Sequence, residues 1–219
     1  MDKKTLQFLD DLRKNNNRDW FNENKERFLQ EKDKSLLFFS QVARLLDKED
    51  EFNSLKMYRI YRDIRFSKDK TPYKNHFSAV YLRKQPFNRG SFYIHIEPNN
   101  SFVGGGFWNP SKEDLLRIRK AIEVEEDLQE IVSNDVFKKV LGKIEGESLK
   151  TTPKGFDKEH PRIELLRHKQ FLLMKRFTDE QVLSPNFKKK IIEVYHVMRP
   201  FFLYMTDVLT TDENGELIV

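Results

Sequence analysis

The sequence contains no cysteine among its 219 residues. This absence excludes disulfide bonds, cysteine-ligated metal sites and thiol catalysis. A chain without disulfides is typical of a reducing compartment, so we expect a cytoplasmic protein. Glycine and proline are also scarce, with eight residues of each. We expect them to mark turns, and the chain has no flexible linker or low-complexity tract.

Long hydrophobic runs are missing as well. No stretch of the sequence approaches the roughly 20 consecutive apolar residues that a membrane-spanning helix needs. The first residues, MDKKTLQFLDDL, are amphipathic and lack the apolar core and small-residue cleavage site of a signal peptide. We therefore expect a cytosolic chain with no membrane partner.

Charge and aromatic content point to a folded domain with a basic surface. Forty Lys and Arg residues oppose 35 Asp and Glu residues, which gives a net charge of +5 and a pI near 9.2. This excess permits nucleic-acid binding but does not indicate it alone. The 19 phenylalanines recur at helical and strand spacings, which predicts a core. The length fits a single domain over residues 1–219.

Hydrophobic periodicity predicts helices toward both ends of the chain and strands in its middle. Helical spacing or capping signals occur over residues 5–14, 18–46, 109–124, 128–141, 162–169 and 184–209. Strand patterns occur over residues 56–66, 76–84, 90–97, 101–108 and 171–177. Because the connections between consecutive strands are short, the sheet should be antiparallel. We predict an α+β fold with a central antiparallel sheet of about four to six strands, flanked by N-terminal, middle and C-terminal helices.

Positive charge is concentrated in residues 58–77, YRIYRDIRFSKDKTPYKNHF, which we call the basic segment. It carries six cations between Arg59 and Lys74 against two acids, Asp63 and Asp69. Arginine offers a planar donor fork that matches phosphate or carboxylate. If the strand alternation holds, Arg62 and Arg65 lie on opposite faces and can serve one site only through a bulge or an early strand end. The alternative is an edge strand whose cations discourage aggregation.

The run GGGFWNPS places Gly104, Gly105 and Gly106 toward the end of a predicted strand, a few residues before a predicted helix. Such a loop could present backbone N–H groups to an anion beside a helix N-terminus. It has neither the Lys-Ser or Lys-Thr ending of a P-loop nor the glycine spacing of a dinucleotide site. The alternative is that the glycines let a neighbouring side chain, such as Tyr93, lie over the backbone.

Two further stretches carry groups that could do chemistry. The strand FYIHIE puts Tyr93, His95 and Glu97 on one face, where they could act as acid and base or bind a metal. A metal site needs a third convergent ligand that the spacing does not supply, so an exposed polar face remains the alternative. A second cluster of donors occupies residues 154–169, with a structural role as its alternative. It comprises Lys154, His160, Arg162, Arg167, His168 and Lys169.

Four stretches together resemble a known family. They are NNNRDWFNENKERF, RDIRFSKDKTPYKNHF, VGGGFWNPSKEDLLRIRKAI and PKGFDKEHPRIELLRHK. In this order they resemble the bacterial and fungal family called domain of unknown function 2461, over nearly the whole chain. The resemblance implies that the stretches belong to one domain, and it carries no established activity, cofactor or catalytic residue. It supports a shared site formed by Arg62, Asp63, Arg65, Lys70, Tyr73, Lys74 and the three glycines.

The function we predict is binding of an anionic small molecule, bearing phosphate or carboxylate, in a basic, aromatic-lined cleft. The predicted ligand-binding residues have four roles. The anion would be held by Arg62 and Arg65, and a positive electrostatic field would come from Lys70 and Lys74. A stacking contact or a hydrogen bond would come from Tyr73, and the ligand could approach the backbone closely at Gly104, Gly105 and Gly106. If the protein is an enzyme, the candidate catalytic residues are His76, His95 and Asp63. No metal site is predicted, and the sequence leaves both the cofactor and the oligomeric state open. The alternatives are a single-stranded nucleic-acid module and a non-catalytic partner-binding protein.

Overall fold

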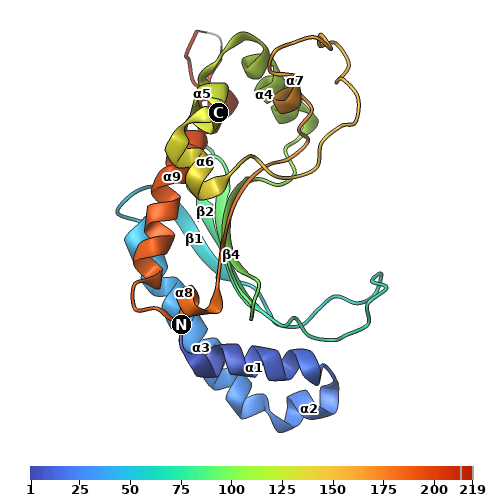
Figure 1. Cartoon of the computed structure of the whole chain (residues 1–219), viewed down its shortest axis with the longest axis vertical. Helices are drawn as coiled ribbons and strands as arrows, with labels where there is room; N and C mark the ends of the chain where they lie inside the picture. The colour runs from blue at the N-terminus through green and yellow to red at the C-terminus, as the bar shows by residue number, and fades with distance from the viewer. Residues whose placement is uncertain (213, 219) are drawn as a thin grey trace. The chain divides into compact units, whose positions relative to one another are not determined.

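A computed structural model describes residues 1–212 and 214–218 of the chain as an α+β fold (Figure 1). The helices are α1 Lys3–Lys14, α2 Arg18–Glu23, α3 Lys25–Leu46, α4 Lys112–Val124, α5 Asp127–Ser133, α6 Asp135–Leu141, α7 Ile163–Leu166, α8 Asp179–Leu183 and α9 Phe187–Thr210. The strands are β1 Phe52–Met57, β2 Phe77–Arg83, β3 Ser91–Ile96, β4 Ser101–Phe107 and β5 Phe171–Phe177. Within these residues, no helix is both long enough and apolar enough to cross a membrane.

The five strands form one antiparallel sheet in the order β1-β2-β3-β4-β5. Each strand therefore pairs with the next strand along the chain, although β4 and β5 are separated by residues 108–170. This confirms the predicted fold class and strand number. The start of β2 lies beside the end of β3 because the two strands are antiparallel neighbours.

The chain forms two compact units. Unit 1 comprises residues 1–81, 93–103 and 176–192, and unit 2 comprises residues 82–92, 104–175 and 193–219. The chain passes between the two units several times, so neither unit is one continuous stretch of sequence. The single domain expected over residues 1–219 stays a prediction.

Aromatic side chains form the core of unit 1. Phe8 of α1 lies 6.2 Å from Phe28 of α3 and 6.3 Å from Phe77 of β2, measured between ring centroids. The predicted helix start at Asn17 is confirmed, because its side chain accepts a hydrogen bond from the Trp20 N–H. These contacts hold the N-terminal helices against the start of β2. They therefore also position the end of the basic segment, which directly precedes β2.

The predicted helix over residues 18–46 is two helices, α2 and α3. The break falls at Asn24, whose side-chain amide donates to the Trp20 carbonyl at 2.9 Å. An asparagine side chain competes for backbone groups in this way and so favours a helix end. Leu36 has an apolar side chain on α3 but is 41% exposed.

The predicted strand over residues 56–66 is wrong. Strand β1 ends at Met57, and the following residues pair with one another. The Arg62 N–H donates to the Pro72 carbonyl at 2.9 Å, and the Lys74 N–H donates to the Ile60 carbonyl at 2.7 Å. The carboxylate of Asp69 accepts from the Thr71 N–H, which stabilises a turn rather than a ladder. The basic segment is therefore mainly a loop between β1 and β2, and its two halves pair with each other.

Candidate functional site

The two arginines of the predicted anion site are each paired with an acid of the basic segment. Arg62 donates to Asp69, and also to the Thr71 hydroxyl at 2.6 Å. Arg65 contacts Asp63 through Nε at 2.9 Å and Nη2 at 2.6 Å. Hydrogen bonds from Thr71 and Arg62 lower the pKa of Asp69 to about 2, so this pair is charged at neutral pH. These guanidinium groups are already neutralised locally.

Lys74 differs from these arginines because no carboxylate pairs with it among the described residues. Its side chain is half-buried, and its Nζ lies 5.3 Å from the centroid of the Tyr58 ring. Burial lowers the pKa of Lys74, and the neighbouring charges of Arg59 and Arg62 lower it further. Lys74 therefore stands in a locally positive and partly desolvated environment. Lys70, by contrast, is exposed and donates to the Ile64 carbonyl at 3.0 Å.

Tyr73 is a core residue. It is 5% exposed and stacks on Phe21 with 3.9 Å between the ring centroids. The side chain of Asn16 accepts from the Tyr73 N–H at 3.1 Å and donates to the Tyr73 carbonyl at 2.9 Å. Phe21 thus stacks on the Tyr73 ring, which is not open to a ligand. The backbone of Tyr73 anchors the basic segment to Asn16, between α1 and α2.

The triple glycine lies inside strand β4 and packs closely within unit 2. A Cβ on Gly105 would come 2.6 Å from the Phe202 ring, and one on Gly106 would come 2.1 Å from the Phe171 carbonyl oxygen. Gly106 also has a φ of +129°, which L residues rarely adopt. Close packing therefore explains Gly105 and Gly106, and the ring that covers Gly105 belongs to Phe202 rather than Tyr93. The predicted role of Gly104, Gly105 and Gly106 in ligand binding stays a prediction.

The donors of residues 154–169 cap a helix. Arg162 donates through Nε to the Ile122 carbonyl at 2.7 Å and through Nη2 to the Glu123 carbonyl at 3.0 Å. The ring of His160 lies 3.1 Å from the same Glu123 oxygen. These carbonyls belong to the last turn of α4, where unpaired acceptors and the helix dipole favour cations. The structural alternative therefore accounts for these two side chains.

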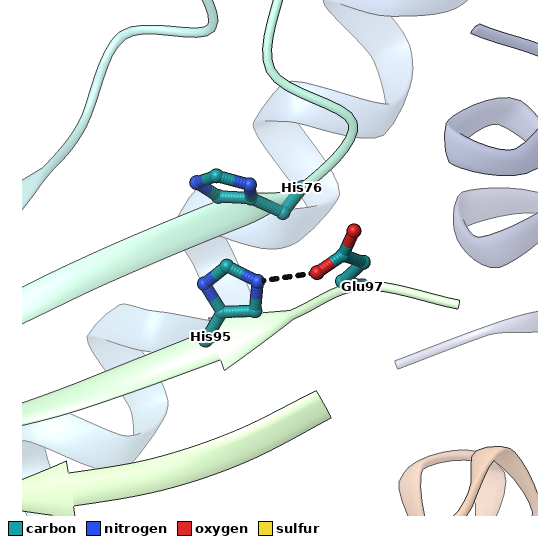
Figure 2. A group of neighbouring side chains, drawn as sticks. All are labelled: His76, His95 and Glu97. Carbon is teal, nitrogen blue, oxygen red and sulfur yellow. Dashed lines mark hydrogen bonds and ion pairs between the residues drawn. The ribbon is translucent and has the colours of Figure 1, made fainter. Parts of the chain in front are cut away.

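His76, His95 and Glu97 come together in unit 1, and we call them the histidine cluster (Figure 2). His76 immediately precedes β2, His95 lies on β3, and Glu97 follows the end of β3. The ring centroids of His76 and His95 are 4.0 Å apart. His95 Nε2 is 2.9 Å from Glu97 Oε2. One donor atom from each of the three residues lies within 4.8 Å of the other two.

Both imidazoles are neutral at neutral pH. Burial lowers the pKa of His76 to about 3, and the adjacent His95 lowers it as well. Burial also lowers the pKa of His95, although Glu97 opposes this shift. For Glu97, burial raises the pKa, but hydrogen bonds from His95 and Asn100 outweigh it and lower the pKa below its usual value. The cluster therefore presents two neutral imidazoles and one carboxylate.

Neighbouring side chains contact two members of the histidine cluster, His95 and Glu97. The Tyr93 hydroxyl lies 3.1 Å from His95 Nδ1, the ring nitrogen opposite Nε2. Asn75 donates to Glu97 Oε1 at 2.5 Å, and Asn100 donates to Glu97 Oε2 at 2.7 Å. Phe102 stacks on the His95 ring with 4.7 Å between centroids. These contacts fix the orientation of His95 and Glu97.

The ring of His76 has no hydrogen-bond partner among residues 1–212 and 214–218, although Lys74 and Arg62 are near enough to lower its pKa. It is the third convergent group that strand spacing could not supply. Sequence analysis named His76 only as a proton carrier. The signal that could have joined it to His95 is the predicted hairpin, since residues before one strand lie beside the end of its antiparallel neighbour. Asp63 is paired with Arg65 and is not one of the three residues of this cluster.

Comparison with known proteins identifies the family of the chain. Neither the curated proteins nor the solved structures include a match to it. A family model described as a conserved hypothetical protein, DUF2461, matches residues 4–204, which is most of the chain. The expected resemblance is therefore confirmed, and the chain belongs to this DUF2461 family of conserved hypothetical proteins.

Proposed function

We propose that the protein binds an anionic small molecule, bearing phosphate or carboxylate, beside Lys74 in unit 1. The observation that carries this proposal is the charge of Lys74: it is half-buried, lies near Arg59 and Arg62, and has no carboxylate partner in the described part of the chain. A cation that is partly removed from water and surrounded by like charge is costly. An anion would offset this cost and receive charge-assisted hydrogen bonds.

Arg59 adds to the same positive field. It is exposed, and its charge contributes to lowering the pKa values of Asp63 and Lys74. Arg62 keeps its bond to Asp69 and contributes as part of that pair. The proposal thus moves the anion from the two paired arginines, where sequence analysis placed it, to Lys74.

Isothermal titration with sulfate and with inorganic phosphate tests this proposal. We expect saturable binding by the wild-type chain and a loss of about tenfold or more in Lys74→Met, since a hydrogen bond to a charged group contributes about 1.5–3 kcal/mol. Arg65→Met is the matched control, because it removes a neighbouring cation that Asp63 already neutralises. Equal losses in the two variants, or no saturable binding by the wild type, would refute the proposal.

One observation favours the second candidate function, binding of single-stranded nucleic acid. Phe66 is 96% exposed, and the Arg65 guanidinium lies 6.0 Å from the centroid of its ring. Exposed aromatics beside cations can stack bases and contact phosphates. Fluorescence anisotropy with an oligothymidine at several salt concentrations distinguishes the two functions. Steeply salt-dependent binding that Phe66→Ser weakens would favour nucleic acid over a small anion.

A further inference from the structure

We infer that His76, His95 and Glu97 form a binding site for a divalent transition-metal ion, with zinc as the ion to test first. The inference goes beyond the proposed anion binding and does not rest on it, because the ligand atoms belong to different side chains. Two imidazole nitrogens and one carboxylate are the ligand set of many catalytic zinc sites and of the facial triad that binds Fe(II).

The distances support a site that needs only small side-chain rotations. Ligand atoms around a tetrahedral zinc ion, each about 2.0–2.1 Å from the metal, are roughly 3.3 Å apart. Here the three donor atoms lie within 4.8 Å of one another. The hydrogen-bonded pair, His95 Nε2 and Glu97 Oε2, is 2.9 Å apart and would open slightly around an ion. Within the described residues, the ring of His76 makes no hydrogen bond that would have to break for it to bind an ion.

The surroundings match what a metal site requires of its outer contacts. A ligating histidine commonly uses its second ring nitrogen to bond a carboxylate, carbonyl or water, which fixes the ring orientation. In His95 the hydroxyl of Tyr93 occupies this position at 3.1 Å from Nδ1. With Nε2 bound to the ion, Nδ1–H would donate to that hydroxyl oxygen. The amides of Asn75 and Asn100 hold both oxygens of Glu97 in the same way.

Histidine clusters also occur as hydrogen-bonded core residues, but this cluster differs from such a core. A core histidine normally finds partners for its ring nitrogens, because an unpaired buried polar group is costly. His76 instead places an unbonded, half-buried imidazole 4.0 Å from the ring of His95. A metal ion would bond the lone pairs of both rings at once. With three protein ligands, zinc would keep an open position for water or for an oxygen of an anionic ligand.

The test measures zinc retained by the full chain after incubation with zinc chloride and gel filtration in a buffer free of oxyanions. We expect one equivalent per chain in the wild type and in His196→Ala, which removes an exposed imidazole of α9 outside the cluster. His76→Ala and Glu97→Gln should weaken zinc binding by at least about 100-fold, more than the loss of an outer contact does. Binding of Co²⁺ should give visible absorption bands that are lost in the same variants.

Folding controls keep the result interpretable. Thermal unfolding without metal should be similar in the wild type and His76→Ala, since this ring makes no hydrogen bond within the described residues, and Glu97→Gln provides a second variant. Zinc should raise the melting temperatures of the wild type and of His196→Ala, and it should leave those of His76→Ala and Glu97→Gln unchanged. Folded wild-type protein that retains no zinc, or folded His76→Ala that retains as much as the wild type, would overturn the inference. Because no sulfate or phosphate is present, either result leaves the anion proposal to its own test.

Discussion

The outer and inner parts of the basic segment behave differently, although both are rich in cations. In the outer part, residues 61–70, three cations have local partners: Arg62 bonds Asp69, Arg65 bonds Asp63, and Lys70 bonds a backbone carbonyl. In the inner part, residues 71–77, Tyr73 is buried and Lys74 has no acid among the described residues. The comparison teaches that charge density does not identify a binding site. What matters is which charges are removed from water without a partner.

The inner part is held in the fold by contacts of Tyr73 with two N-terminal residues. Asn16 bonds both backbone groups of Tyr73, and Phe21 covers its ring. A segment held so firmly cannot move Lys74 or His76 far toward solvent. Both side chains therefore stay in a partly desolvated environment, which is the condition that makes a ligand or a metal ion favourable there.

Substituting an aromatic residue in each part should give the largest contrast. Tyr73→Ala should lower the free energy of unfolding by about 3–5 kcal/mol, because it leaves a cavity against Phe21. Phe66→Ala should change it by less than about 0.5 kcal/mol, because that ring is exposed. Urea denaturation followed by circular dichroism measures both. Similar effects in the two variants would mean that the inner part is not anchored as described.

The next largest effect concerns the Tyr93 hydroxyl, which contacts His95 Nδ1. Tyr93→Phe removes the partner of His95 Nδ1 and should weaken zinc binding by about 10–100-fold. Tyr58→Phe is the control, because it also deletes a tyrosine hydroxyl, on a ring 6.2 Å from that of Tyr93, but leaves the contacts of His95 in place. Competition with a chromophoric chelator gives both affinities. If Tyr93→Phe binds zinc as the wild type does, Tyr93 does not position a metal ligand.

A smaller effect should link the two ligands. Zinc at the histidine cluster would add positive charge near Lys74, whose own charge reaches both imidazoles. We expect zinc to tighten sulfate binding by about fivefold, and sulfate to tighten zinc binding by the same factor. Titrations of each ligand with and without the other measure this coupling. Independent affinities would show that the anion site and the metal site are not coupled.

The smallest effect should come from releasing the paired arginines. Asp69→Asn frees Arg62, which is near Lys74, and should tighten sulfate binding by about two- to threefold, in keeping with the modest strength of exposed ion pairs. Asp63→Asn frees Arg65, which is not among the charges that lower the pKa of Lys74, and should leave the affinity unchanged. Sulfate titration of the two variants compares them directly. A larger gain in Asp63→Asn would place the anion at Arg65 instead of Lys74.

Much of the fold could be predicted from the sequence because helices and strands depend on nearby residues. The caps at Asn17 and Ser111 follow from local side-chain hydrogen bonds, and both are present. Strands β2, β3, β4 and β5 follow from their apolar patterns and flanking turns. The strand predicted over residues 56–66 failed because Asp69 bonds its own backbone neighbour, and alternation alone does not reveal such competition.

The sequence by itself determined the α+β class, the antiparallel order of neighbouring strands and the family to which the chain belongs. Only the tertiary structure decided which polar groups meet. It covered Gly105 with Phe202, paired Arg62 with Asp69, and brought His76 to His95 and Glu97. The physical reason is range: periodicity and capping act over a few residues, whereas burial and charge pairing depend on neighbours that folding brings from elsewhere in the chain.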